Sequence, residues 1–171
     1  MFLSLVLFLV ALSACYSLSI WPQPQNIVGE GSTTLQVDEF FSFSSGCEGS
    51  TVLSAAFKRY EELIKSSMKA LGKSQMSMKG DYPLIGFCSV VIGDSEAQLD
   101  FGVSESYTLS VTEDGVCSIQ ADTIWGELRG IETFSQLLEG DVEEGVLVMN
   151  SAPIVISDSP RFPHRLISFI A

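Results

Sequence analysis

Histidine and basic residues are scarce in this sequence. The 171 residues include one histidine, His164, and 9 Lys and Arg against 21 Asp and Glu, which gives a net charge of −12. Phosphate binding needs a basic face, so the charge argues against a nucleic-acid partner. A lone histidine argues against a His-based metal centre. We therefore expect no nucleic-acid partner, no metal and no cofactor.

The sequence also lacks C-x-x-C pairs and N-x-S/T sequons. The first absence argues against a zinc site built from thiolates. Cys15 lies at the edge of the first hydrophobic segment, which leaves Cys47, Cys88 and Cys117 for one disulfide and one free thiol. Cys117 falls inside an expected strand, where a buried and unreactive thiol is typical.

The first 19 residues carry no charged side chain, and a hydrophobic run extends from Phe2 to Leu12. This run has the length of a signal-peptide core and is too short to span a membrane. Small residues between Ser13 and Ser17 offer cleavage positions. We predict a signal peptide over residues 1–19, entry into the secretory pathway and no membrane span after its removal. A buried N-terminal strand or helix is the alternative.

Periodicity predicts an α+β fold, a mostly antiparallel β-sheet with two amphipathic helices packed on one face. The helices are expected at 51–71, capped by Ser50 or Thr51, and at 123–140, where Glu127 stands near the first turn. A hairpin is expected over 107–121 with its turn at Asp114-Gly115. Further strands are expected at 33–37, 40–45, 83–93, 145–150 and 153–157.

Two glycines in the second helix, Gly126 and Gly130, are four residues apart. No strand–loop–Gly-Lys context surrounds them, so a phosphate loop does not fit. We expect them to allow close packing of the helix on the sheet.

Chemically suggestive residues gather in one stretch, "DSPRFPHR" at 158–165. It contains Arg161, Phe162, His164 and Arg165, which can stack, bind charge or move protons. Packing of the connector and plain surface exposure are the alternatives for these residues. No Ser/His/Asp set exists, and the acidic pairs elsewhere are typical of solvated loops.

Several motifs together resemble the β-hexosaminidase family, glycoside hydrolase family 20 of the lysosomal animal type. They are "WPQPQ" at 21–25, "YTLSV" at 107–111, the helix W-G-x-x-R-G-x-E-T-F-S-Q-L at 125–137 and "PRFPHR" at 160–165. The resemblance covers the N-terminal, non-catalytic α+β domain of that family. It implies a domain at 20–157 and a connector at 158–171 that leads into a (β/α)₈ catalytic barrel absent from this chain.

The resemblance also implies a function. These enzymes remove terminal N-acetylhexosamine from glycoconjugates with the help of an Asp-Glu pair on the barrel, so this chain would hold no catalytic residue and be inactive alone. Arg165 matches the arginine that binds sugar hydroxyls, and Cys47 and Cys88 match a disulfide of the domain. A lysosomal or secreted location follows by the same resemblance, and a dimer of the full-length enzyme is compatible with it.

The sequence departs from the family pattern at two positions. Leu166 follows Arg165 where the family has a glycine, and Ser106 stands where a glycosylated Asn is often found. Similarity therefore stops at residue 166, which suggests a truncated, alternatively spliced or wrongly assembled gene product. The alternative is a stand-alone secreted module with a binding or regulatory role.

Overall fold

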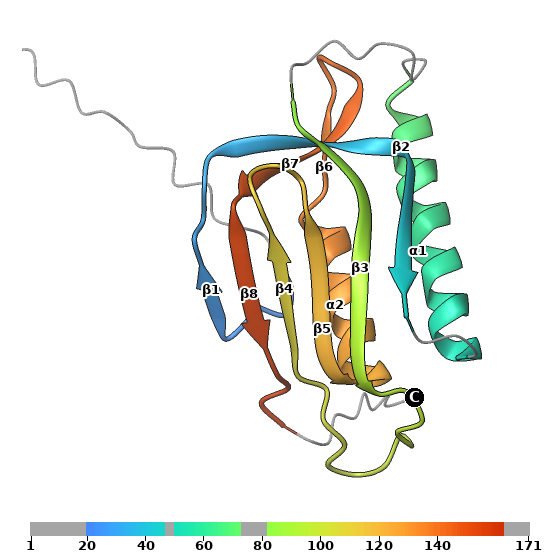
Figure 1. Ribbon diagram of the computed structural model, residues 1–171. Helices are drawn as coiled ribbons and strands as arrows, with labels where there is room; N and C mark the ends of the chain where they lie inside the picture. Colours follow the sequence, from blue (N-terminus) through green and yellow to red (C-terminus); the bar gives the residue numbers. More distant parts are fainter. Residues whose placement is uncertain (1–19, 47–49, 73–81, 163–171) are drawn as a thin grey trace, which may run out of the picture.

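One curved β-sheet with two helices on one face forms the described part of the chain (Figure 1). The computed structural model describes residues 20–46, 50–72 and 82–162. The sheet has eight strands in the order β1-β8-β4-β5-β3-β2-β7-β6. The pairs β2–β3 and β3–β5 are parallel and the other neighbours are antiparallel. The predicted α+β class is confirmed.

The elements have the following bounds in chain order: β1 (Asn26–Val28), β2 (Thr33–Ser45), α1 (Thr51–Ala70), β3 (Leu84–Asp94), β4 (Tyr107–Val111), β5 (Cys117–Thr123), α2 (Ile124–Gln136), β6 (Glu139–Asp141), β7 (Val146–Ala152) and β8 (Ile154–Asp158).

Local signals in the sequence explain where α1 begins and ends. The backbone N–H of Leu53 donates to Ser50 Oγ at 3.3 Å, so Ser50 is the N-cap. The helix stops before Gly72, whose φ of 74° lies in the left-handed region that glycine adopts without strain. Its buried residues, Leu53, Ala56, Ile64 and Met68, follow the helical period and face the core.

The hairpin forms as its turn chemistry predicts. β4 and β5 pair antiparallel from Val111↔Cys117 to Tyr107↔Ala121. Gly115 has φ of 87° at the turn. Alternation along β4 buries Tyr107, Leu109 and Val111 and turns the residues between them outward.

The second helix follows directly from β5 and lies very close to the sheet. Thr123 is its N-cap, because Gly126 N–H donates to Thr123 Oγ1 at 3.4 Å. A Cβ at Gly126 would lie 2.3 Å from the carbonyl oxygen of Ser106, and one at Gly130 would lie 2.4 Å from Ile119 Cγ2. The expected role of both glycines in close helix–sheet packing is confirmed.

The hydrophobic core fills the space between the sheet and its two helices. Phe134 of α2 stacks on Phe41 of β2 with ring centroids 5.4 Å apart, and its edge meets Phe43 at 5.9 Å. Ile119 and Ile131 are also fully buried there. Neither helix of the described chain is long and apolar enough to cross a membrane.

Four elements differ from the sequence prediction. The second helix, expected to reach 140, ends at Gln136, and β6 begins at Glu139. The two strands expected at 33–37 and 40–45 form one strand, β2, which carries a register irregularity between Val37 and Ser42. Figure 1 shows β2 crossing one end of the sheet and then bending along α1. The short edge strands β1 and β6 were not predicted, because three-residue strands have too few positions to show a period.

Candidate functional site

The predicted site residues fall mostly outside the part of the chain that the structure describes. Arg165 and His164 lie in the segment 163–171, and Cys47 lies in 47–49; both segments are outside the described residues. The expected roles of Arg165 and His164 therefore stay predictions. Arg161 and Phe162 are described, and both are exposed.

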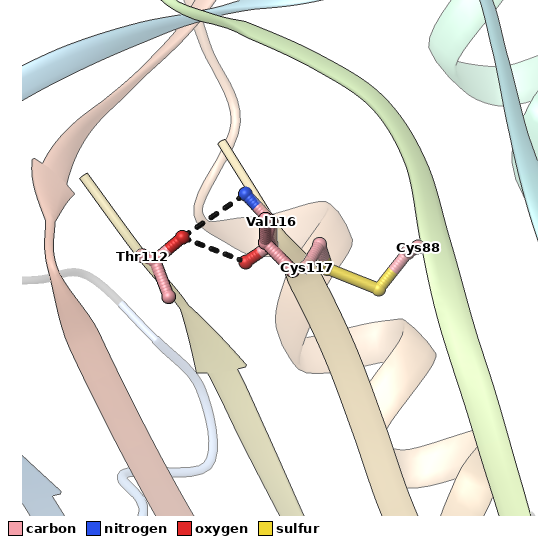
Figure 2. Close-up of a disulfide and its surroundings, with 4 residues drawn as sticks. All are labelled: Cys88, Thr112, Val116 and Cys117. Carbon is pink, nitrogen blue, oxygen red and sulfur yellow. Dashed lines mark hydrogen bonds between the residues drawn. A yellow bond between two sulfur atoms is a disulfide. The ribbon is translucent and has the colours of Figure 1, made fainter. Parts of the chain in front are cut away.

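The disulfide in the structure is not the expected one. Cys88 is bonded to Cys117 (Figure 2), and a cysteine forms a single disulfide, so the predicted Cys47–Cys88 pairing is corrected. Cys88 of β3 and Cys117 of β5 are register partners in adjacent parallel strands, which places their Cα atoms 4.6 Å apart, within disulfide reach. The sequence left the state of Cys117 open, and the structure places it in this disulfide.

A groove of about 650 Å³ lies where the two ends of the domain meet. We call it the junction groove. It is lined by the N-terminal segment Trp21–Gln25, by Glu105 and Tyr107, by Arg129, Glu132, Thr133 and Gln136 of α2, and by Asp158–Phe162 at the end of β8. Trp21 and Phe162 are 82% and 66% exposed. The groove therefore presents two aromatic side chains beside charged groups.

Hydrogen bonds tie the N-terminal segment to α2 and to the segment after β8. Trp21 N–H donates to Gln136 Oε1 at 2.7 Å, and Gln136 Nε2 donates back to the Trp21 carbonyl at 2.9 Å. Gln25 N–H donates to Asp158 Oδ1 at 3.1 Å, and Gln25 Nε2 donates to Ser159 Oγ at 3.0 Å. These contacts hold residues 21–25 and 158–159 in one place, although they lie more than 130 positions apart in the sequence.

Each carboxylate of the junction groove has a partner. Arg129 Nε lies 2.7 Å from Glu105 Oε2. Glu132 accepts from Gln136 Nε2 at 2.8 Å and from the hydroxyl of Tyr60. Asp158 accepts from Gln25, as described above. These contacts fix the positions of the three acidic side chains and so help to hold the groove in shape.

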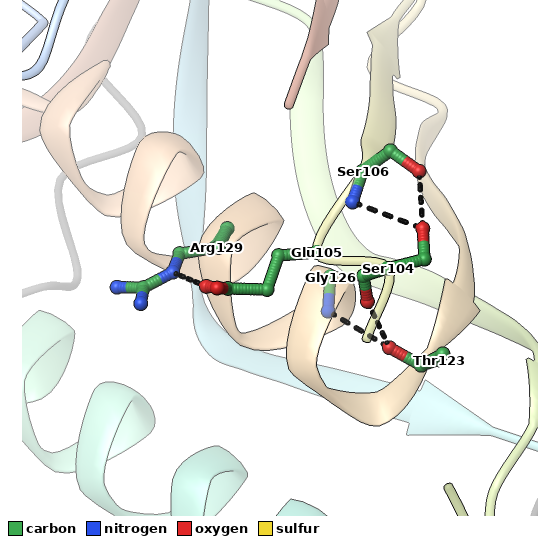
Figure 3. A network of polar contacts seen from close by, with 6 residues as sticks. All are labelled: Ser104, Glu105, Ser106, Thr123, Gly126 and Arg129. Atoms are coloured by element: carbon green, nitrogen blue, oxygen red, sulfur yellow. Dashed lines mark hydrogen bonds and ion pairs between the residues drawn. The ribbon is translucent and has the colours of Figure 1, made fainter. Parts of the chain in front are cut away.

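A second polar network fixes the first turn of α2 to the loop before β4 (Figure 3). Thr123 Oγ1 donates to the Ser104 carbonyl at 2.6 Å while it caps the helix. The hydroxyls of Ser104 and Ser106 lie 2.7 Å apart. Trp125 Nε1–H donates to the Ala97 carbonyl at 2.9 Å. Both ends of the loop 95–106 are thus bonded to the start of α2.

A buried acid inside this region was not recognised from the sequence. Glu127, expected near the first turn of the helix, is 0% exposed, and neither carboxyl oxygen has a hydrogen-bond partner among the described residues. Burial raises the pKa of Glu127 to about 8. The backbone of Ala121 opposes this rise in pKa, although it does not form a hydrogen bond of ordinary geometry with the carboxyl group. One signal was available: Glu127 precedes the core residues Ile131 and Phe134 by four and seven positions, which places it on the buried stripe.

Beyond the junction groove, the described residues form a further hollow and no cluster of metal ligands. No group of three or more His, Cys, Asp or Glu side chains among them could hold a metal ion. A second hollow of about 610 Å³ is lined by amide and hydroxyl side chains such as Gln25, Thr108 and Gln120, and by the carboxylates of Asp122 and Asp158.

Comparisons with known proteins identify what the chain is similar to. Residues 20–137 match the family described as beta-acetyl hexosaminidase like. The chain is 34% identical over 168 residues to beta-hexosaminidase subunit alpha of Rattus norvegicus, covering 93% of this chain and 30% of the rat protein. It is also 34% identical over 185 residues to beta-hexosaminidase 1 of Arabidopsis thaliana, covering 95% of this chain and 34% of that protein.

Solved structures show the same fold at lower identity. The chitobiase of Flavobacterium johnsoniae aligns with a TM-score of 0.60 at 20% identity, covering 85% of this chain and 21% of that one. The beta-N-acetylhexosaminidase of Bacteroides fragilis aligns with a TM-score of 0.50 at 17% identity, covering 83% and 25%. The chain spans about a third of the length of the curated relatives it matches.

Proposed function

Because the chain belongs to the beta-acetyl hexosaminidase like family, we propose that it serves as the N-terminal, non-catalytic domain of a β-N-acetylhexosaminidase. The match over residues 20–137 is the observation that carries this proposal. The length comparison supports it, since relatives named beta-hexosaminidase are about three times as long as the aligned region. On this proposal the 171-residue chain does not hydrolyse hexosaminides by itself.

The proposed role of the domain is to position the connector that follows it, and not to catalyse hydrolysis. Its boundaries would be 20–157, with 158–171 as the connector toward a catalytic barrel. The bonds from Gln25 to Asp158 and Ser159 support this role, because they set the direction in which the chain leaves β8. Arg165 would then reach a substrate of the full-length enzyme and bind sugar hydroxyls through its guanidinium group.

Substrate and location follow from the same proposal. The full-length enzyme would remove terminal N-acetylhexosamine from glycoconjugates, in a lysosomal or secreted setting reached through the signal peptide at 1–19. The names "subunit alpha" and "subunit beta" among the relatives support a dimer of full-length chains. Trp21 and Phe162, the exposed aromatic residues of the junction groove, support the idea that another part of the full-length enzyme packs on this surface.

Activity of the purified chain tests this proposal directly. We expect no release of 4-methylumbelliferone from its N-acetyl-β-glucosaminide above the buffer rate, because an arginine alone supplies binding without an acid, a base or a charge-stabilising carboxylate. A full-length relative under the same conditions is the positive control. If the purified chain hydrolyses this substrate, and the activity stays with the chain through a second purification, the proposal is wrong.

The size of the native product separates this function from a stand-alone module. An antibody raised against residues 51–140 would detect the product in a tissue extract. A band several times larger than the chain supports a domain of a full-length enzyme. A single band near the mass of 171 residues favours an independent binding or regulatory protein.

A further inference from the structure

Glu127 occupies a position that charged carboxylates almost never occupy in folded proteins. Its side chain is fully buried, and neither carboxyl oxygen has a hydrogen-bond partner within the part of the chain that the structure describes. A buried carboxylate without a partner is strongly disfavoured relative to the neutral acid. The surroundings of Glu127 therefore select its protonated form.

The packing around Glu127 leaves the side chain little room to escape toward water. The helix on both sides of it is pressed against the sheet, since Gly126 meets the Ser106 carbonyl and Gly130 meets Ile119. Thr123 and Trp125 anchor the same turn to the loop 95–106. If Glu127 ionises, a change of its side-chain rotamer is therefore not enough to bring the charge to water, and the first turn of α2 has to move.

The charged groups around α2 do not compensate a charge on Glu127. The elements β3, β4, β5 and α1 pack against this helix. Asp94 of β3 is the register partner of Thr123, Asp122 precedes the cap, Tyr107 of β4 binds Thr133, and Tyr60 of α1 binds Glu132. The cations nearby have other partners: Arg129 of α2 pairs with Glu105, and Arg59 of α1 lies over the Tyr60 ring. Burial raises the pKa of Glu127 to about 8, and no charged group contributes to that rise.

We propose that Glu127 makes the contact between α2 and the sheet proton-dependent, closed while the carboxyl is neutral and loosened when it ionises. The folded state binds this proton more tightly than the unfolded chain does. The stabilisation is fully present below the ordinary glutamate pKa and is lost as the pH rises through the folded-state pKa. In this window each pH unit lowers the folded-to-unfolded ratio about tenfold. The contribution of Glu127 to stability is therefore largest in acidic surroundings, and this inference does not depend on the proposed function.

The first loosening is expected at the start of α2 and in the loop 95–106. Trp125 reports on this region, because its indole N–H binds the Ala97 carbonyl. The other tryptophan, Trp21, is 82% exposed and can be replaced by Phe to leave Trp125 as the single reporter. The emission of Trp125 should shift to longer wavelength as the pH rises.

The test compares the full chain with Glu127→Gln, which keeps the shape and removes the titration. Urea unfolding at pH 5, 6, 7 and 8 at constant ionic strength gives the stability of each protein. We expect the wild-type folded-to-unfolded ratio to fall about a hundredfold from pH 5 to pH 7, and the variant to lose this dependence. Glu62→Gln on the exposed side of α1 is the matched control, since it removes one surface carboxylate and should keep the wild-type slope.

Two outcomes would overturn the proposal. One is an equal pH slope in wild type and Glu127→Gln. The other is a titration midpoint of the Glu127 carboxyl near 4.5, measured on the wild-type chain by carbon NMR of its side chain. The NMR titration needs no substitution, so the proposal remains testable even where Glu127→Gln does not fold. A midpoint far above that value, together with the shift of Trp125 emission, supports it.

Discussion

The close approach of α2 to the sheet predicts a marked loss of stability for Gly126→Ala. The added Cβ would lie 2.3 Å from the Ser106 carbonyl oxygen and 2.8 Å from Ala121 Cβ. One of these contacts is backbone, so the helix itself has to withdraw. Overpacking of this kind costs about 1–3 kcal/mol, and the better helix propensity of Ala returns up to about 1 kcal/mol. Because the 2.3 Å contact is with a backbone atom, the cost should lie in the upper part of that range, about 2–3 kcal/mol. We therefore expect a net loss of about 1–2 kcal/mol in the free energy of unfolding.

Thermal and urea unfolding followed by circular dichroism measure this loss. For a chain of this size, about 1 kcal/mol lowers Tm by roughly 2–4 °C. Gly86→Ala on β3 is the matched control, because a Cβ at Gly86 would meet nothing within 4 Å. If Gly126→Ala is as stable as Gly86→Ala, the helix does not lie as close to the sheet as the structure places it, and the reasoning is refuted.

Two further predictions concern the links between distant parts of the chain. Replacing both Cys88 and Cys117 with Ala removes a cross-link that spans 29 positions; the chain-entropy estimate is a loss of about 3–4 kcal/mol. Peptide mapping without reduction should recover these two cysteines joined to each other, and a Cys47–Cys88 peptide would contradict the structure. Gln136→Ala removes both bonds to Trp21 and should cost about 1–2 kcal/mol. It should also speed proteolysis near residues 20–25, and an unchanged cleavage rate would show that these bonds do not hold the segment.

The elements with a regular period could be predicted from the sequence. α1 and the β4–β5 hairpin formed close to their expected bounds, because periodicity, caps and turn residues act over a few neighbouring positions. The second helix also formed, although it ends at Gln136 rather than at 140. The β2 strand was divided in the prediction because its polar residues Asp38 and Glu39 look like a break.

The candidate site could be predicted only in part. The stretch at 158–165 was recognised by its residue types, yet its neighbours in the junction groove come from residues 21–25 and from α2. Spacing along the chain carries no information about which distant residues share a groove. The same limit explains the disulfide, since three cysteines allow several pairings and only the register of β3 and β5 selects Cys88 and Cys117.

The sequence by itself determined the fold class, both helices, the central hairpin and the family of this protein, because these depend on local patterns and on motifs that can be read in order. Only the tertiary structure decided the partner of Cys88, the contacts that join Gln25 to Asp158, and the burial of Glu127. Each of these depends on which surfaces meet when the helices close on the sheet. That closure brings together residues whose separation in the chain says nothing about their separation in space.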